Sequence, residues 1–261
     1  MTTMPALFIS HGSPMLAIQD SPARGFLLEL GKSLPRPEAI VVFSAHWESL
    51  GNPAVSFAER PETIHDFGGF PPALFEMQYP APGAPELAGR IAALLEQTGL
   101  AVKRSPTRGL DHGAWVPLRL MYPDADIPVL QVSVLRDGTP AEHERLGLAL
   151  SGLRGEGVLV IGSGSLTHNL YEFRGQGLDA PVQSWASEFA DWMHDQLRHG
   201  RREALLDYRR KAPHAERNHP TDEHLLPLFA AMGAGGGTAR GERLHSSYEY
   251  GVLAMDVYAF A

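Results

Sequence analysis

Three histidines come directly or shortly after hydrophobic runs of β-type composition. His11 follows residues 7–10, His46 follows residues 41–45, and His168 comes a few residues after a third such run. Because the carboxyl ends of parallel strands meet at one edge of an open α/β sheet, side chains that follow those strands can converge in one crevice. A single histidine in such a place is more often structural, but three in equivalent positions favour a shared chemical site.

The chemistry that such a site can perform is restricted by the absence of cysteine. Without cysteine the chain can have no thiolate metal site, no cysteine nucleophile and no disulfide. Neutral imidazole nitrogen is a good ligand for zinc and iron(II), so any remaining ligand must be a carboxylate, another histidine or water. The sequence therefore predicts a metal site held by histidines at the C-terminal edge of the sheet.

A further ligand is expected near the end of the chain, where three histidines lie five residues apart: His214, His219 and His224. They cannot share one helical face, because that spacing turns them away from each other and Pro220 interrupts the run. Thr221 is expected to cap a helix that runs to Met232, which places His224 in its first turn. We therefore predict His224 as a ligand. The structural alternative for His219 is a simple hydrogen bond to the loop backbone.

Two other regions are candidates for the substrate side of the site. His112 stands beside Gly113 and Trp115, a combination that can line a flat, partly apolar pocket for an aromatic ring, although Trp115 can equally belong to the core. His65 is a weaker candidate at the edge of the proline-rich stretch 67–85, which is either a functional lid or a surface excursion. Three histidines among charged neighbours are expected to face solvent: His143, His194 and His199.

The elements that must position these residues alternate between strand and helix patterns. Strands are predicted at residues 6–10, 40–45, 129–134 and 158–162, with helices at 25–32, 85–97, 141–153 and 182–199. This alternation is typical of an α/β fold with a mostly parallel central sheet flanked by helices. Residues 250–260 are expected to form a closing strand. Without a repeat or compositional break, residues 1–261 are predicted to form a single domain.

Composition limits the partners of the chain. The formal net charge is −8 and no block of Lys and Arg is present, which argues against a nucleic-acid partner. No apolar stretch approaches the length of a membrane span, and the first apolar run is too short for a signal sequence. The expected location is therefore the cytoplasm.

Five segments in their order along the chain closely resemble the class III (LigB-type) extradiol ring-cleavage dioxygenases, and within them the DOPA extradiol dioxygenase-like branch. The resemblance spans nearly the whole chain, and five ordered motifs are far more specific than any one of them. The segments are Phe8-Ile9-Ser10-His11-Gly12-Ser13-Pro14, Phe43-Ser44-Ala45-His46-Trp47-Glu48, Asp111-His112-Gly113-Ala114-Trp115, residues 162–170 around His168, and residues 219–228 around His224.

This resemblance implies roles for the histidines. It implies that His11 and His46 bind the metal, that His168 is the acid/base in the pocket, and that His112 assists near the substrate. It also implies a third ligand in the last helix, which is a glutamate in the protocatechuate-cleaving branch and falls on His224 here. Iron(II) is expected for activity, with zinc(II) as the alternative bound metal. With substrate absent, His168 can complete the shell as a fourth metal ligand.

The reaction that the resemblance implies is the oxygen-dependent opening of a catechol ring outside its two hydroxyls. His168 would take a hydroxyl proton, and His168 or His112 would return one. The expected partners are O2 and a small-molecule catechol, DOPA-like or related. The protein itself is expected to be a monomer or a homodimer.

The same residues also allow other functions. One alternative is a zinc-dependent hydrolase, in which the metal activates water. A second is a non-catalytic metal-binding protein, which would not need both His168 and His112. The start His11-Gly12-Ser13 also resembles the tetrapyrrole metal chelatases, but residues 44–47 and 219–228 do not fit that group.

Overall fold

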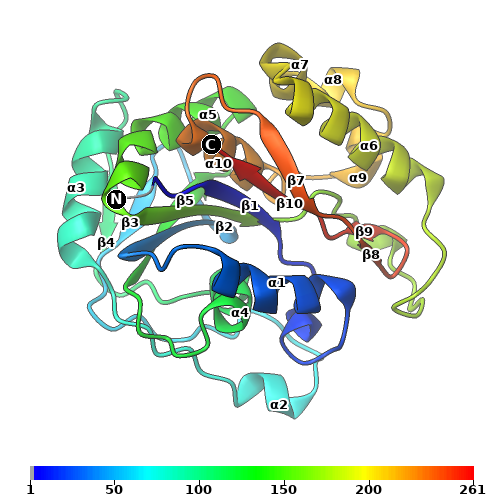
Figure 1. The fold of residues 1–261 in the computed structure, drawn as a ribbon, viewed down its shortest axis with the longest axis horizontal. Helices are drawn as coiled ribbons and strands as arrows, with labels where there is room; N and C mark the ends of the chain where they lie inside the picture. The colour runs from blue at the N-terminus through cyan, green and yellow to red at the C-terminus, as the bar shows by residue number, and fades with distance from the viewer. Residues whose placement is uncertain (1–2) are drawn as a thin grey trace.

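The computed structural model describes residues 3–261 and contains an eight-stranded mixed sheet with helices on both faces (Figure 1). The strand order is β4-β3-β5-β2-β6-β1-β10-β7. The central four strands are parallel: β5 (Val129–Leu135), β2 (Ala39–Ser49), β6 (Val158–Gly164) and β1 (Ala6–Ser10). The others are β4 (Lys103–Ser105), β3 (Ala54–Ser56), β10 (Val257–Phe260) and β7 (Gly241–His245), with β8 (Tyr248–Glu249) and β9 (Leu253–Ala254) in a separate two-stranded sheet.

Helices cover the sheet in two layers. One layer contains α1 (Pro22–Ser33) and α4 (His112–Met121), and the other contains α3 (Pro85–Glu96), α5 (Pro140–Ala149), α6 (Ser184–His199) and α10 (Leu226–Gly235). The shorter helices are α2 (Pro72–Phe75), α7 (Arg202–Leu206), α8 (Tyr208–Lys211) and α9 (Ala215–Asn218), and the 3-10 turns are η1 (Pro14–Ala17), η2 (Ser151–Glu156) and η3 (Leu170–Glu172).

The central strands are hydrophobic along their whole length because both faces are buried. In β1, Phe8 packs into the core under α5 and α10, whereas Leu7 and Ile9 pack into the core under α1 and α4. Successive side chains of a strand point to opposite faces, so a strand with a helix layer on each side needs an apolar residue at every position. The continuous hydrophobic runs in the sequence follow from this arrangement, and the predicted mostly parallel sheet is confirmed.

One predicted helix begins in the wrong place. The helix expected from Thr221 instead begins at Leu226, and residues 221–224 form turns before it. Pro227 explains the difference: proline lacks an N–H and is favoured in the first turn of a helix, whereas a helix from Thr221 would place it in the interior, where it removes a hydrogen bond. The carboxylate of Asp222 also accepts a hydrogen bond from the Tyr208 hydroxyl, which ties the preceding turn to α8.

Three smaller predictions were also wrong in detail. The helix expected over 141–153 ends at Ala149 and is followed by the 3-10 turn η2, and the closing strand is confined to Val257–Phe260. His143 is buried rather than solvent-facing, because its Nε2 accepts the backbone N–H of Leu135 at 2.9 Å. A histidine can close a strand-to-helix turn in this way, and its charged neighbours on α5 concealed that role.

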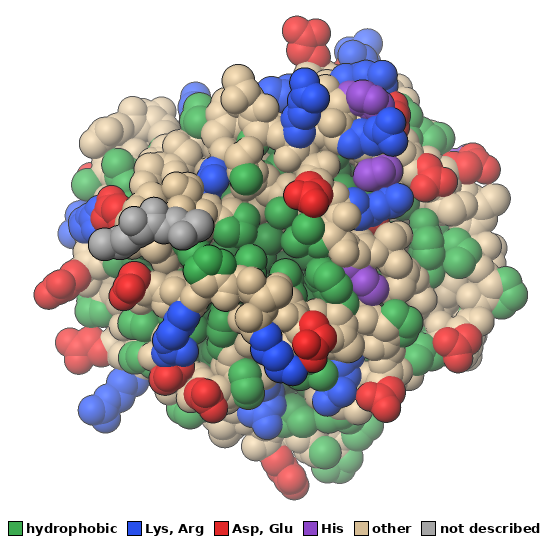
Figure 2. Space-filling model, in the orientation of Figure 1, with side chains coloured by type: hydrophobic (Ala, Val, Ile, Leu, Met, Phe, Trp, Pro, Cys, Tyr) green, Lys and Arg blue, Asp and Glu red, His purple; other side chains and the backbone are tan. Residues whose placement is uncertain are grey.

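The surface of the molecule carries both signs of charge. On the face shown in Figure 2, acidic and basic side chains are interspersed, and several basic side chains alternate with histidines at the upper right. Within residues 3–261, no helix has both the length and the apolar character needed to cross a membrane.

Candidate metal centre

The structure brings His11, His46 and His224 together at the C-terminal edge of the parallel strands. His11 directly follows β1, His46 lies in the last part of β2, and His224 lies in the turn before α10. The Nε2 atoms of His11 and His46 are 2.9 Å apart. One ligand atom from each of the three residues lies within 4.8 Å of the other two. These distances are short enough for all three imidazoles to share one cation.

In His11 and His224, a hydrogen bond to one ring nitrogen determines which nitrogen is left to face the other histidines. Ser163 donates its hydroxyl proton to the Gly113 carbonyl, so its oxygen accepts from Nδ1 of His11 at 2.9 Å. Nδ1 of His224 lies 2.9 Å from a Glu223 carboxylate oxygen, which can only accept. Both rings therefore carry their proton on Nδ1 and present the bare Nε2. A ligand histidine bound through one nitrogen characteristically donates from the other in this way.

The Nε2 atom of His224 gives a direct test of whether a metal fits. This atom is buried and has no hydrogen-bond partner among the described residues. A buried polar atom without a partner costs about 1–3 kcal/mol, so such atoms are rare unless something else binds them. A cation bound by the three imidazoles would satisfy this lone pair, and the donor set suits zinc or iron(II). The residues present fit a transition metal.

The environment keeps these imidazoles neutral. Burial lowers the pKa of His11 well below its usual value, and the neighbouring histidines lower it further. Burial also lowers the pKa of His46 and of His168 to about 4, and that of His224 well below its usual value. Near neutral pH the rings are therefore in the form that binds a metal or accepts a proton.

The rings of His168 and His112 lie against two of these three histidines. The ring of His168 is stacked on that of His224 with centroids 3.5 Å apart, and the ring of His112 lies 3.9 Å from that of His46. His168 is held in the loop after β6 by a backbone hydrogen bond to Asn218, and His112 is the first residue of α4. All the histidines predicted for the site are thus within one cluster.

A cavity of about 290 Å³ opens beside the histidines. Its lining includes four histidines, the carboxylate of Asp66 and several apolar side chains. The apolar side chains are Pro14, Phe67, Phe70, Leu170 and Leu253. A lining that combines a few polar groups with apolar and aromatic side chains is typical of a pocket for a small aromatic ligand.

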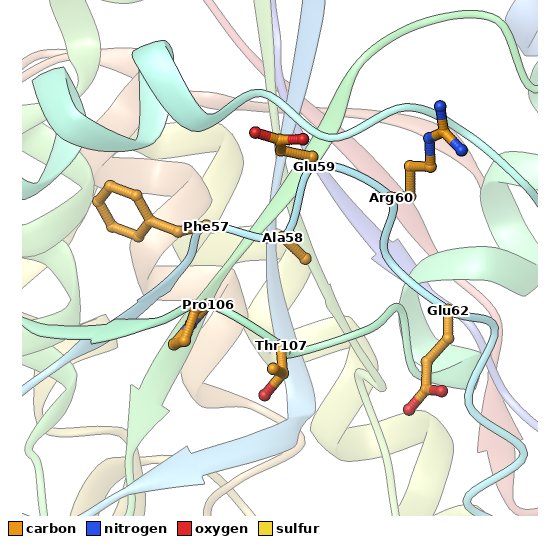
Figure 3. Close-up of a pocket in the computed structure, with 7 residues that line it drawn as sticks. All are labelled: Phe57, Ala58, Glu59, Arg60, Glu62, Pro106 and Thr107. Atoms are coloured by element: carbon orange, nitrogen blue, oxygen red, sulfur yellow. The ribbon is translucent and has the colours of Figure 1, made fainter.

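A larger and shallower hollow of about 580 Å³ lies elsewhere, beside β3 and β4. Figure 3 shows its lining, which includes Glu59, Arg60 and Glu62 but no histidine. The donor set expected for zinc or iron(II) is therefore found at the histidine cluster and not at this hollow.

Several residues that support the site gave weak or no signals in the sequence. Asp111 is fully buried and caps α4, and its carboxylate accepts hydrogen bonds from Ser44 at 2.6 Å and Arg108 at 2.6 Å. Its only signal in the sequence was its place in the Asp111–Trp115 segment of the family resemblance. Asp66 accepts two hydrogen bonds from His112, although nothing in its local sequence indicated this.

Two of the weaker histidine candidates have structural roles. His65 makes a 3.0 Å contact from Nε2 to the Met77 carbonyl, and His219 makes a 2.9 Å contact to the Leu166 carbonyl. His219 therefore matches the structural alternative given for it. The 67–85 stretch lies partly over the cavity, since Phe67, Gly68 and Phe70 line it.

Gly164 holds the backbone of the His224 turn close to β6, and this gives a testable expectation. A Cβ at Gly164 would overlap the His224 carbonyl oxygen, which also accepts the Ser165 N–H. We expect Gly164→Ala to lower the free energy of unfolding by about 1–3 kcal/mol, as overpacking does, and to weaken metal binding by displacing His224. Chemical denaturation and metal titration measure the two effects.

The matched control for this substitution is Gly155→Ala. A Cβ at Gly155 meets no atom within 4 Å, so this variant should keep wild-type stability and wild-type metal binding. Equal behaviour of the two variants would show that the close approach at Gly164 is unimportant.

Comparison with known proteins identifies the family to which the chain is similar. The family described as the catalytic LigB subunit of aromatic ring-opening dioxygenase matches residues 5–260. The 4,5-DOPA dioxygenase extradiol of Beta vulgaris is 46% identical over 259 residues, which cover 97% of this chain and 95% of that protein. The 4,5-DOPA dioxygenase extradiol of Escherichia coli strain K12 is 42% identical over 236 residues, covering 89% and 86%.

A solved structure agrees with the sequence comparison. The crystal structure of an uncharacterized protein from Escherichia coli K12 matches with a TM-score of 0.81 and 34% identity, covering 99% of this chain and 100% of that chain. LigB extradiol dioxygenases are non-haem metal enzymes, which agrees with a histidine cluster able to hold a metal. The chain belongs to the LigB family of aromatic ring-opening dioxygenases.

Proposed function

We propose that this protein opens the ring of a catechol beside its two hydroxyls, with His11, His46 and His224 holding the metal. The observation that carries the proposal is the unpartnered Nε2 of His224, which is buried beside the facing Nε2 atoms of His11 and His46. The aromatic-sized cavity next to this point supplies the place for the substrate. Metal, substrate ring and acid/base groups would then lie within one crevice.

Iron(II) is the proposed metal for turnover, and zinc(II) is the alternative occupant. Imidazole suits both ions, so the three histidines do not themselves distinguish them. Bound iron(II) would supply the redox chemistry that lets an electron-rich ring react with dioxygen, which zinc cannot do.

His168 is proposed as the base that accepts a hydroxyl proton from the catechol. Its lowered pKa keeps the ring unprotonated near neutral pH, and the ring lines the cavity beside His224. A positioned base of this kind contributes about 10²–10⁴-fold to a rate. Stacking against His224 holds the imidazole in place, so proton transfer does not have to wait for the side chain to reorient.

His112 is proposed to hold and return a proton to the substrate. Its Nδ1 is engaged by Asp66 at 3.0 Å, so Nε2 is the nitrogen available to the cavity. The aromatic substrate would lie between the histidines and the apolar walls formed by Phe67, Phe70 and Leu253. Such walls also exclude water from the reacting ring.

Oxygen uptake with a panel of catechols tests the proposal. The protein is loaded with iron(II) without oxygen, then mixed with aerated catechols including DOPA, the compound named for its relatives. We expect oxygen consumption together with a yellow ring-opened product from at least one catechol, and none from the zinc-loaded protein. Hydrolysis of esters or amides by the zinc form, with no oxygen uptake by the iron form, would support the hydrolase alternative.

A further inference from the structure

Asp66 is bonded to two different groups of the same histidine. Its Oδ1 atom accepts a hydrogen bond from the backbone N–H of His112 at 3.0 Å and lies 3.0 Å from Nδ1 of the His112 ring. The carboxylate is about a quarter exposed, at 23%, while the His112 side chain is 7% exposed. One carboxylate oxygen therefore holds both the backbone and the ring of His112.

These two bonds determine the protonation pattern of the ring. An ionised carboxylate can only accept hydrogen bonds, so Nδ1 of His112 must carry the proton that Asp66 accepts, and Nε2 is the nitrogen left free of Asp66. The backbone N–H that Asp66 accepts is the first of α4, a group that has no partner within the helix itself. Asp111 caps the same helix end at Ala114, so Asp66 and Asp111 satisfy different groups.

The same residue lies at the start of the segment that forms the apolar wall of the cavity. Phe67, the next residue, packs edge-on against His112 with ring centroids 5.6 Å apart. Two residues before Asp66, the carbonyl of Ile64 accepts a hydrogen bond from Nε1 of Trp115 at 3.0 Å. The segment is thus fastened to α4 on both sides of Asp66, at His112 and at Trp115.

We propose that Asp66 is a positioning residue. It fixes the tautomer of His112, and it holds Phe67, the next residue, in place against the His112 ring at the cavity. The inference rests on the proposed role of His112 in ring opening. Hydrogen-bond partners that orient a functional imidazole typically change activity by about 10- to 100-fold when they are removed.

A competing role for Asp66 is that of a metal ligand. Asp66, His46 and His112 offer atoms close enough to hold an ion, and Oδ2 of Asp66 lies 3.6 Å from Nδ1 of His46. However, Oδ1 is already used by two groups of His112, and the Nε2 of His46 faces His11. The positioning role uses the contacts that the structure contains, and metal content distinguishes the two.

The test compares Asp66→Asn with the matched control Glu76→Gln. Glu76 is an exposed carboxylate ten residues further along the same stretch. We expect Asp66→Asn to keep the wild-type metal content and KM while kcat falls by about 10- to 100-fold. The control should keep wild-type values, and Asp66→Glu, which restores a carboxylate, should recover part of kcat. Wild-type kcat in Asp66→Asn, or loss of its metal, would overturn the proposal.

A spectroscopic measurement tests the same idea independently of activity and of variant folding. Nitrogen-15 chemical shifts of the histidine rings in the zinc-loaded wild-type protein report which nitrogen of His112 carries the proton, with His112→Gln used for assignment. The expected form carries a proton at Nδ1, and a ring protonated only at Nε2 would overturn the proposal. Failure of the proposed function would look different, because the wild type and Glu76→Gln would then consume no oxygen while this readout remained valid.

Discussion

Replacing His224 by alanine should remove the bound metal and abolish ring opening. The substitution deletes one of the three imidazoles that converge on the site, and the Glu223 carboxylate that orients it loses its partner. Loss of even an outer partner of a metal ligand costs about 10- to 100-fold, so loss of a ligand itself should exceed that range. Metal content after reconstitution and the rate of oxygen uptake measure the effect.

The control for this variant is His199→Gln, on the exposed end of α6. It removes an imidazole at a distance from the cluster and should leave metal content and turnover unchanged. One tightly bound equivalent of metal in His224→Ala would show that His224 is not required for the site.

Replacing His168 by alanine should leave the metal in place and lower turnover by at least about 100-fold, the lower end of what a positioned acid/base supplies. The three ligand candidates remain, and only the neutral ring stacked on His224 is lost. The measurement is kcat for oxygen uptake together with metal content in the same sample.

The two readouts separate the roles that His168 can have. Turnover near that of the wild type would remove its role as the base. Loss of metal from His168→Ala would instead make it a ligand that the site requires. Substrate binding can be followed independently by equilibrium titration of the zinc-loaded variant, in which the catechol is not consumed.

The composition of the ligand set has a consequence for the metal. Oxygen-activating iron sites commonly combine two histidines with one carboxylate, whereas this cluster presents three imidazoles. A carboxylate is nevertheless close to the cluster, because that of Glu223 accepts a hydrogen bond from Nδ1 of His224. A carboxylate partner raises the basicity of a ligand imidazole, so with His224 as a ligand Glu223 would partly supply the negative charge that a direct carboxylate ligand gives.

The central part of the fold could be predicted because its strands are buried on both faces. Such strands are hydrophobic at every position, which made β1, β2, β5 and β6 visible as short runs between helical patterns. The histidines that follow β1 and lie near the end of β2 could then be assigned to one sheet edge. The family resemblance supplied the role expected of each histidine.

The rest depended on contacts between segments distant in the chain. The predicted start of α10 is too early because Thr221 is a residue type that commonly caps helices, whereas the observed helix begins beside Pro227. The charged neighbours of His143 along α5 favour a position at the surface, whereas its hydrogen-bond partner is the backbone of β5, which is not adjacent to those neighbours in the sequence pattern. Asp66 lies in an irregular stretch, and only the folded structure places it against His112, 46 residues away.

Anomalous diffraction from crystals grown with iron(II) or zinc(II), recorded at the absorption edge of the metal, tests most directly whether three imidazoles share one cation. We predict a single strong peak about 2.0–2.1 Å from Nε2 of His11, His46 and His224, the usual length of a bond between zinc and imidazole. A peak bound instead by Asp66 and His112, or an ordered metal elsewhere with these three rings left unligated, would contradict the account.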